Sequence, residues 1–193
     1  MKKLTLVLFV TLIATACSKK EESVVPVATT VKPKVVEPVK IGDIYSFTLV
    51  PELYLHHKQF RDIAVEEINA AGGVLGRPIK VIGRDDQGEP GAAIRAAEDL
   101  VLREKVEFLS GTLISHVTLA VSEYADRNKI LFMNAWATSP TISYEQGRPF
   151  TFSMAVNTNA ETAIVASEVA KGKAQRWSTV AFNLDDGKAA VKY

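Results

Sequence analysis

Residues 60–84 read FRDIAVEEINAAGGVLGRPIKVIGR, a stretch that combines a helix, a stop and a strand. Its first half carries apolar residues at the spacing of one face of an α-helix, namely Phe60, Ile63, Ala64, Ile68 and Ala71. Gly72 and Gly73 end this helix, and a turn at residues 76–78 leads into a predicted strand over residues 79–84. A helix followed so closely by a strand is typical of α/β proteins.

The same alternation extends over the rest of the chain from about residue 39. Short apolar runs predict strands over residues 39–46, 79–84, 108–109, 130–133 and 177–182, and residues 150–154 form a candidate edge strand. Amphipathic patterns predict helices after Pro90, near Val117 and, with capping-box spacing, at Thr158. This order predicts a doubly wound, flavodoxin-like parallel sheet with strand order 2-1-3-4-5 and helices on both faces.

The predicted topology also indicates where a ligand would bind. In open α/β sheets, ligands occupy the crevice at the carboxyl ends of the strands, where the winding of the chain reverses. For this strand order the reversal lies between the first and third strands. The loops that reach it are residues 45–51, 111–115 and 134–139.

Two of these loops carry residues suited to a small carboxylate. Ser115 stands near the start of a predicted helix, where its hydroxyl and the following backbone N–H groups suit an anion. The same hydroxyl equally suits the capping of its own helix. Trp136 offers a flat wall beside the hydroxyls of Thr138 and Ser139. An aromatic residue at the end of a strand favours a pocket over an incidental place in a loop.

The sequence holds no convincing catalytic or metal-binding arrangement. Asp85 and Asp86 are adjacent, so on an extended chain they point in opposite directions, and turn formation or helix capping explains them better than paired catalysis. His56 and His57 are adjacent in the same way, and no third ligand is spaced to complete a metal site. The glycines of residues 72–76 follow a helix and not a strand, and no G-x-S-x-G motif occurs. We therefore predict no enzyme activity, no metal and no cofactor.

The N-terminus predicts export. Lys2 and Lys3 precede an apolar run over residues 4–13, which is shorter than the roughly 20 residues of a membrane-spanning helix and fits a cleavable signal peptide over residues 1–16. Residues 14–17 read ATAC and resemble a bacterial lipobox, in which the cysteine is acylated. Cys17 is the only cysteine, and acylation explains a single thiol in an oxidising compartment. The alternative is an ordinary secretory signal with a chance cysteine.

Composition and charge complete this domain plan. Residues 17–38 are rich in valine, proline, threonine and lysine and predict an extended tether, followed by a folded domain over residues 39–193. The chain has a net charge of +1, which gives no reason to expect nucleic acid as a partner. We predict a protein of the bacterial cell envelope that is attached to a membrane through acylated Cys17 and faces the periplasm or the exterior.

Three segments carry a family resemblance. Residues 39–42 (VKIG), 64–78 (AVEEINAAGGVLGRP) and 84–90 (RDDQGEP) resemble the leucine/isoleucine/valine-type solute-binding proteins of ABC importers, which have the type I periplasmic-binding-protein fold. The resemblance runs from about residue 39 to residue 193. In that family two similar α/β lobes close on a ligand held between them. The resemblance implies a receptor that delivers a small amino-acid-like solute to a permease.

The resemblance also assigns roles to residues. Ser115 and Thr138 match positions of the family's carboxylate clamp, and Trp136 matches a position that supplies backbone contacts. The family usually has a Gly- and Pro-bearing turn in the first loop, which begins here with Tyr45. It usually has a small residue at the position of Trp136. We take Tyr45 as a fourth ligand-binding residue. The added bulk predicts a ligand that is smaller, flatter or more aromatic than leucine.

Members of that family are nearly twice as long, so the chain is expected to hold only the N-terminal lobe. One lobe cannot close, and this predicts weak binding by the chain alone. Three other functions remain open: a ligand sensor on the same fold, a hydrolase on a flavodoxin-like sheet, and an inert truncated lobe.

Overall fold

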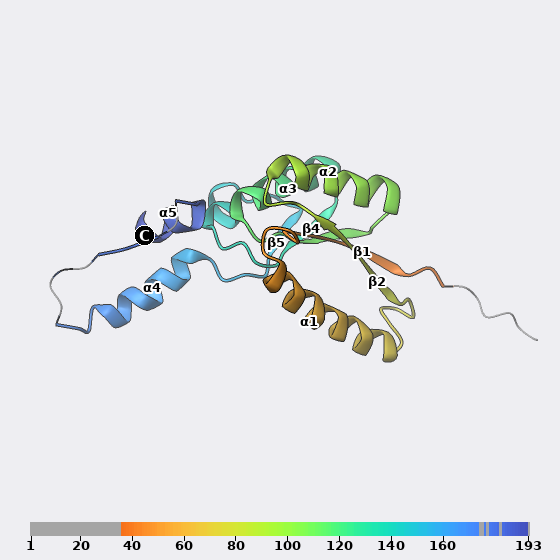
Figure 1. The fold of residues 1–193 in the computed structure, drawn as a ribbon, viewed down its shortest axis with the longest axis horizontal. Helices are drawn as coiled ribbons and strands as arrows, with labels where there is room; N and C mark the ends of the chain where they lie inside the picture. The colour runs from red at the N-terminus through yellow and green to blue at the C-terminus, as the bar shows by residue number, and fades with distance from the viewer. Residues whose placement is uncertain (1–35, 174–175, 177, 182, 193) are drawn as a thin grey trace, which may run out of the picture. The chain divides into compact units, whose positions relative to one another are not determined.

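The computed structural model describes residues 36–173, 176, 178–181 and 183–192. These residues form a five-stranded parallel sheet with the strand order β2-β1-β3-β4-β5 (Figure 1). The strands are β1 (Val39–Tyr45), β2 (Ile79–Asp85), β3 (Phe108–Gly111), β4 (Leu131–Asn134) and β5 (Thr151–Ser153). The α-helices are α1 (Pro51–Ala70), α2 (Pro90–Glu98), α3 (Ser115–Asn128), α4 (Thr158–Val169) and α5 (Asp185–Lys192), and π-helical segments occur at Asp99–Glu104 and Thr141–Glu145.

The predicted α/β class and the strand order 2-1-3-4-5 are confirmed, but the prediction of the fifth strand was wrong. That strand was placed at residues 177–182, whereas the described residues 178–181 form no strand and Val180 is 98% exposed. The candidate edge strand takes the position instead, because Phe132 N donates to Phe150 O and Met154 N donates to Asn134 O along the edge of β4. With that edge occupied by β5, residues 178–181 have no place beside β4.

The core lies between the sheet and the helices α2 and α3. Figure 1 shows these two helices on one face of the sheet and α1 on the other. The small residues Ala93 and Ala97 of α2 are fully buried and let this helix lie close to the sheet. The other fully buried apolar residues of this cluster are Ile44, Leu100, Leu109, Val117, Val121, Ala125 and Phe132.

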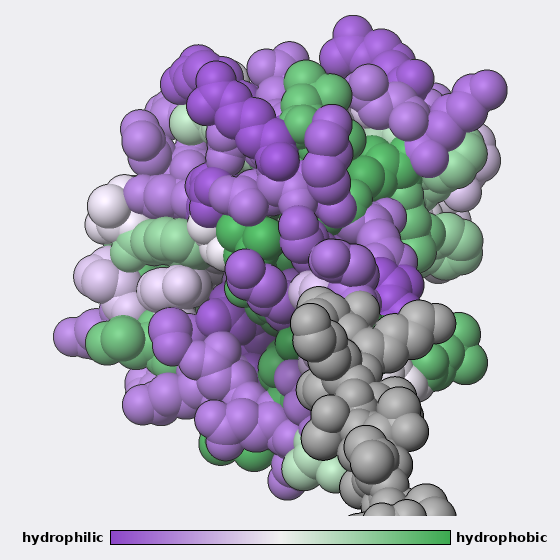
Figure 2. All heavy atoms as spheres, turned by 90° about the vertical axis from the view of Figure 1, so that its right-hand side faces the viewer, coloured by the Kyte–Doolittle hydropathy of each residue, from purple (hydrophilic) through white to green (hydrophobic). Residues whose placement is uncertain are grey.

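The opposite face of the sheet is covered less completely. None of the side chains of α1 is buried, and of the predicted apolar stripe Phe60 is 73% and Ile63 53% exposed. A cavity of about 200 Å³ separates α1 from β1, β2 and β3. The prediction of a helix here is confirmed, while the stripe expected to face the core is largely exposed. Figure 2 shows apolar side chains (green) reaching the surface among hydrophilic ones (purple) on the face that it draws.

α1 also begins earlier than predicted, at Pro51, since proline is favoured at the first position of a helix. The first loop is correspondingly short. The predicted signal peptide, Cys17 and most of the tether lie outside the described residues. None of the helices described is long and apolar enough to cross a membrane.

Candidate functional site

The point where the chain's winding reverses lies at the carboxyl ends of β1 and β3. From β1 the chain enters α1 on one face of the sheet, and from β3 it enters α3 on the other (Figure 1). Gly111 ends β3 with a φ of +109°, and a Cβ there would lie 2.2 Å from Ile44 O. Thr112 N then donates to the same Ile44 O over 2.6 Å. Glycine therefore lets β3 approach β1 closely at the predicted ligand crevice.

Ser115 is the first residue of α3 and is 5% exposed. It does not cap this helix, because the cap position is Ile114 and no side chain accepts there. Its Oγ instead accepts a hydrogen bond from Ser139 N over 3.4 Å, from the loop after β4. The interpretation of Ser115 as a helix cap is therefore wrong. The hydrogen bond between Ser139 and Ser115 connects two of the three predicted loops.

The loop after β4 is built around Asn134, which is fully buried. Its side chain accepts from Ala137 N (3.0 Å) and donates to Ala137 O and Ser153 Oγ (2.8 Å each). Thr138 comes next and is partly buried. Thr158 Oγ1 lies 3.2 Å from the carbonyl oxygen of Thr138 and 3.3 Å from its hydroxyl oxygen, and Thr158 N donates to the same carbonyl over 2.9 Å. These bonds fix Thr138 beside Ser139, the residue that donates to Ser115.

Trp136 projects from the same loop and is 40% exposed. Its indole Nε1–H donates to Nδ1 of His57 in α1 over 3.4 Å, and the two rings meet edge to face. The indole also meets the ring of Tyr45 edge to face at a centroid distance of 6.4 Å. Since β3 lies between β1 and β4 in the sheet, the indole passes over the carboxyl end of β3.

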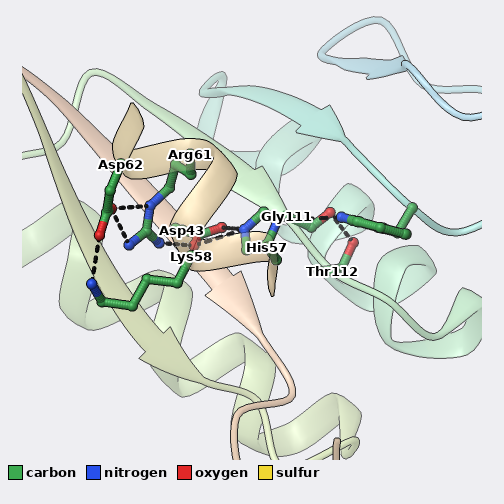
Figure 3. Close-up of polar contacts among 8 residues, drawn as sticks. Asp43, His57, Lys58, Arg61, Asp62, Gly111 and Thr112 are labelled. Carbon is green, nitrogen blue, oxygen red and sulfur yellow. Dashed lines mark hydrogen bonds and ion pairs between the residues drawn. The ribbon is translucent and has the colours of Figure 1, made fainter. Parts of the chain in front are cut away.

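His57 is held by a buried carboxylate that sequence reasoning did not find. Asp43 of β1 is 2% exposed, and its Oδ2 lies 3.2 Å from His57 Nε2 and 2.5 Å from Arg61 Nη1. Figure 3 shows Asp43 between His57 and Arg61, with Arg61 also bonded to Asp62. Because Nδ1 of His57 accepts from the indole, Nε2 is the nitrogen that donates to Asp43.

Tyr45 lies behind His57, with the two rings stacked at 4.7 Å and 8°. It is fully buried, and its hydroxyl has no hydrogen-bond partner among the described residues. Burial, followed by the charges of Asp43 and Asp86, raises the pKa of this hydroxyl to about 12. That Tyr45 contacts a ligand stays a prediction; in the structure its ring is buried and stacks on His57.

Asp85 and Asp86 form turns, as predicted, and also hold the first loop. Asp85 accepts from Phe47 N, Thr48 Oγ1 and Gln87 N over 2.8–3.0 Å. Asp86 is fully buried and accepts from Ser46 Oγ (2.6 Å) and Gly88 N (2.8 Å) through Oδ1. Its Oδ2 has no partner among the described residues, and burial raises the pKa of this carboxyl.

The residues considered for metal binding are not assembled into a site. His56 is exposed, whereas His57 is engaged by Asp43 and Trp136. Within the described part of the chain, no group of three or more histidine, cysteine, aspartate or glutamate residues could hold a metal ion. The arrangement at the carboxyl ends of β3 and β4 instead offers hydroxyl groups, a helix N-terminus and an aromatic wall.

Comparison with known proteins agrees with this description. Residues 58–193 match the family model of the periplasmic binding proteins. An "Amino acid binding protein" of Pseudomonas aeruginosa is 36% identical over 91 residues, which are 47% of this chain and 24% of that protein. The "Leu/Ile/Val-binding protein BraC3" of Rhizobium johnstonii is 35% identical over 80 residues, 42% of this chain and 22% of that protein. "Chemotactic signal transduction system substrate-binding protein BasB" of Halobacterium salinarum is 26% identical over 139 residues, 69% of this chain and 34% of that protein.

Solved structures show the same fold. A periplasmic binding protein of Burkholderia mallei has a TM-score of 0.69 and 27% identity, covering 81% of this chain and 42% of its own. An ABC transporter substrate-binding protein of Desulfitobacterium hafniense, solved with Leu, has a TM-score of 0.72 and 20% identity and covers 81% and 45%. A solute-binding protein of Rhodopseudomonas palustris, solved with 3,4-dihydroxybenzoic acid, has a TM-score of 0.70 and 23% identity and covers 80% and 42%. The chain thus spans less than half the length of these proteins and corresponds to a single lobe.

Proposed function

The chain belongs to the periplasmic binding protein family, and we propose that it captures a small amino-acid-like carboxylate and presents it to the permease of an ABC importer. The family is one of solute-binding proteins and not a class of enzymes. Its location is extracytoplasmic. The solute, the permease and the mode of attachment are parts of the proposal.

One observation carries the proposal for the solute. The hydroxyl oxygen of Ser115 accepts a hydrogen bond from Ser139 N, and the hydroxyl oxygen of Thr138 lies 3.3 Å from Thr158 Oγ1. Neither hydroxyl donates to another of the described residues, so each can donate to a ligand. A carboxylate accepts such bonds strongly, and the N-terminus of α3 adds backbone N–H groups and a favourable dipole.

The names of the relatives support an amino acid or a related acid. Two of the matched relatives carry amino-acid binding in their names, and one neighbouring structure holds Leu. Since this chain offers contacts from one side of a ligand only, we expect it to bind weakly on its own.

We further propose that residues 1–16 are removed as a signal peptide and that Cys17 is acylated. The lipobox-like sequence ATAC at residues 14–17 supports this, as does the Pro-bearing stretch that follows it. Two or more acyl chains would hold the folded domain at a membrane, because each buried CH₂ contributes about 0.8 kcal/mol. Mass spectrometry of the membrane fraction, compared with a Cys17→Ser variant, tests this step.

The proposed site is tested by replacing its hydroxyls one at a time. Ser115→Ala and Thr138→Val each remove one donor to the carboxylate, which we expect to weaken binding of L-leucine or benzoate about tenfold. Ser143→Ala is the matched control, because this serine is exposed on the π-helical segment Thr141–Glu145. If Ser115→Ala and Thr138→Val bind these acids as tightly as Ser143→Ala, the proposed site is wrong.

A second candidate, a ligand sensor, is favoured by the similarity to the substrate-binding protein BasB of a chemotactic signalling system. It would use the same site and differ only in the membrane partner. Crosslinking in cells distinguishes the two, since a permease subunit as the captured partner supports transport and a transducer supports sensing.

A further inference from the structure

Five aromatic rings form a chain at the carboxyl end of β1 that ends on the exposed Trp136. Phe47 stacks on Tyr54 at 3.9 Å, Tyr54 meets Tyr45 at 5.8 Å, and Tyr45 stacks on His57. The last ring is Trp136, which is 40% exposed, whereas Tyr45 is fully buried. We call these five residues the aromatic cluster. Its exposed end stands on the same loop as Thr138, two residues away.

The orientation of Trp136 does not depend on its own loop alone. His57 is fixed from two sides, by the ring of Tyr45 and by the buried carboxylate of Asp43. Asp43 is fixed in turn by Arg61. As a result, Nδ1 of His57 is directed at the indole N–H of Trp136 and accepts its hydrogen bond. The indole, which is 40% exposed, is therefore held in place by contacts within the protein.

We propose that this site selects solutes that carry a planar aromatic ring on their carboxylate, with Trp136 as the wall and His57 as the residue that positions it. The inference rests on the function proposed above, since the carboxylate end is taken by the hydroxyls of Ser115 and Thr138. A flat ring can lie against an indole in offset or edge-to-face contact, which an aliphatic ring cannot reproduce. Because the indole is already oriented, little ordering is lost on binding. We expect a preference of roughly three- to tenfold for the aromatic acid.

The test uses two acids of nearly equal size, benzoate and cyclohexanecarboxylate, titrated into the full chain in detergent. The readout is the NMR signal of the Trp136 indole N–H, identified by its absence in Trp136→Phe, because the chain has two tryptophans. Tighter binding of benzoate, by threefold or more, supports the inference. Equal binding of both acids at Ser115 and Thr138 overturns the aromatic preference and leaves the carboxylate site intact. Binding of neither acid at these residues overturns the proposed function and the inference with it.

Variants separate positioning from a general effect on folding. His57→Ala is expected to lower the affinity for benzoate more than the affinity for cyclohexanecarboxylate, and so to abolish the preference. His57→Gln, whose amide oxygen can accept from the indole, is expected to restore part of the preference. His56→Ala is the matched control, since His56 is exposed on the same turn of α1. Trp136→Leu removes the wall at a partly exposed position and tests the inference even if His57→Ala does not fold. An unchanged preference in Trp136→Leu contradicts the proposal.

Discussion

The indole N–H of Trp136 donates to Nδ1 of His57 over 3.4 Å, although the two residues are 79 positions apart in the chain. The bond joins the loop after β4 to the second turn of α1 and passes over the end of β3. It connects the exposed wall of the proposed site with the buried Asp43 and Arg61. The stability of α1 and the shape of the site are therefore expected to respond to the same substitutions.

Replacing Asp43 tests how strongly this buried carboxylate anchors α1. Asp43→Ala leaves Arg61 and His57 without their shared partner, and removing one member of a buried ion pair typically costs about 3–5 kcal/mol. Because Arg61 keeps its ion pair with Asp62, we expect a loss at the lower end of this range, about 3 kcal/mol. The free energy of unfolding in urea measures this loss. Asp62→Ala is the control: Asp62 is 40% exposed, and its loss should cost less than about 1 kcal/mol. If both variants lose the same free energy of unfolding, the burial of Asp43 does not strengthen its contribution to stability.

Removing the hydroxyl of Tyr45 should not destabilise the protein. The group is buried without a hydrogen-bond partner among the described residues, so Tyr45→Phe removes an uncompensated polar atom and keeps the stacking on His57. We expect a free energy of unfolding equal to that of the wild type or higher by up to about 1 kcal/mol. A loss above about 1 kcal/mol in thermal or urea unfolding would reveal a partner for this hydroxyl.

The carboxyl of Asp86 should make stability depend on pH. Burial raises the pKa of Asp86 in the folded protein, so the folded state is more stable when this carboxyl is protonated. The resulting stabilisation is fully present below the ordinary carboxyl pKa. It is lost as the pH rises through the raised pKa. Asp86→Asn keeps an oxygen for Ser46 and Gly88 and cannot ionise. We expect this variant to be more stable than the wild type at pH 7, by on the order of 1 kcal/mol, with a smaller advantage at pH 4. Urea unfolding at both pH values checks this, and a variant less stable at pH 7 would refute it.

Adding a methyl group to Gly111 should separate β1 from β3. A Cβ at this position would lie 2.2 Å from Ile44 O, and the φ of +109° is itself unfavourable for alanine. We expect Gly111→Ala to lower the free energy of unfolding by about 3 kcal/mol or more. Gly76→Ala is the matched control, since Gly76 also has a positive φ but a methyl group added there would have no atom within 4 Å. A cost near 1 kcal/mol is expected there, and a similar cost for both would exclude a steric role for Gly111.

Much of the fold could be predicted because it depends on local patterns. The switch between helical and strand periodicity, the glycines after α1 and the proline at the start of α2 marked the alternation of elements from which the strand order was inferred. The error at residues 177–182 has a physical cause: a run of strand-like residues says nothing about which sheet edge is free, and the three residues of β5 already occupy the edge of β4.

The proposed site was only partly predictable. Ser115, Thr138 and Trp136 follow from their places at strand ends, because topology alone brings those ends together. The link between Asp43, His57 and Arg61 was missed because α1 was expected to begin near residue 60, which left His57 outside the helix. With the earlier start, His57 and Arg61 are four residues apart on one helical face, and this spacing is the signal that could have identified them.

The most direct test of the proposed site is an NMR titration of the full chain with L-leucine and with benzoate, which locates any binding site residue by residue. We predict weak binding, with the largest amide shifts at Ser115, Thr138 and Ser139 and, for benzoate, at the indole of Trp136. Shifts confined to the cavity beneath α1, or no shifts up to the highest soluble concentration of both acids, would contradict capture of a carboxylate at the carboxyl ends of β3 and β4.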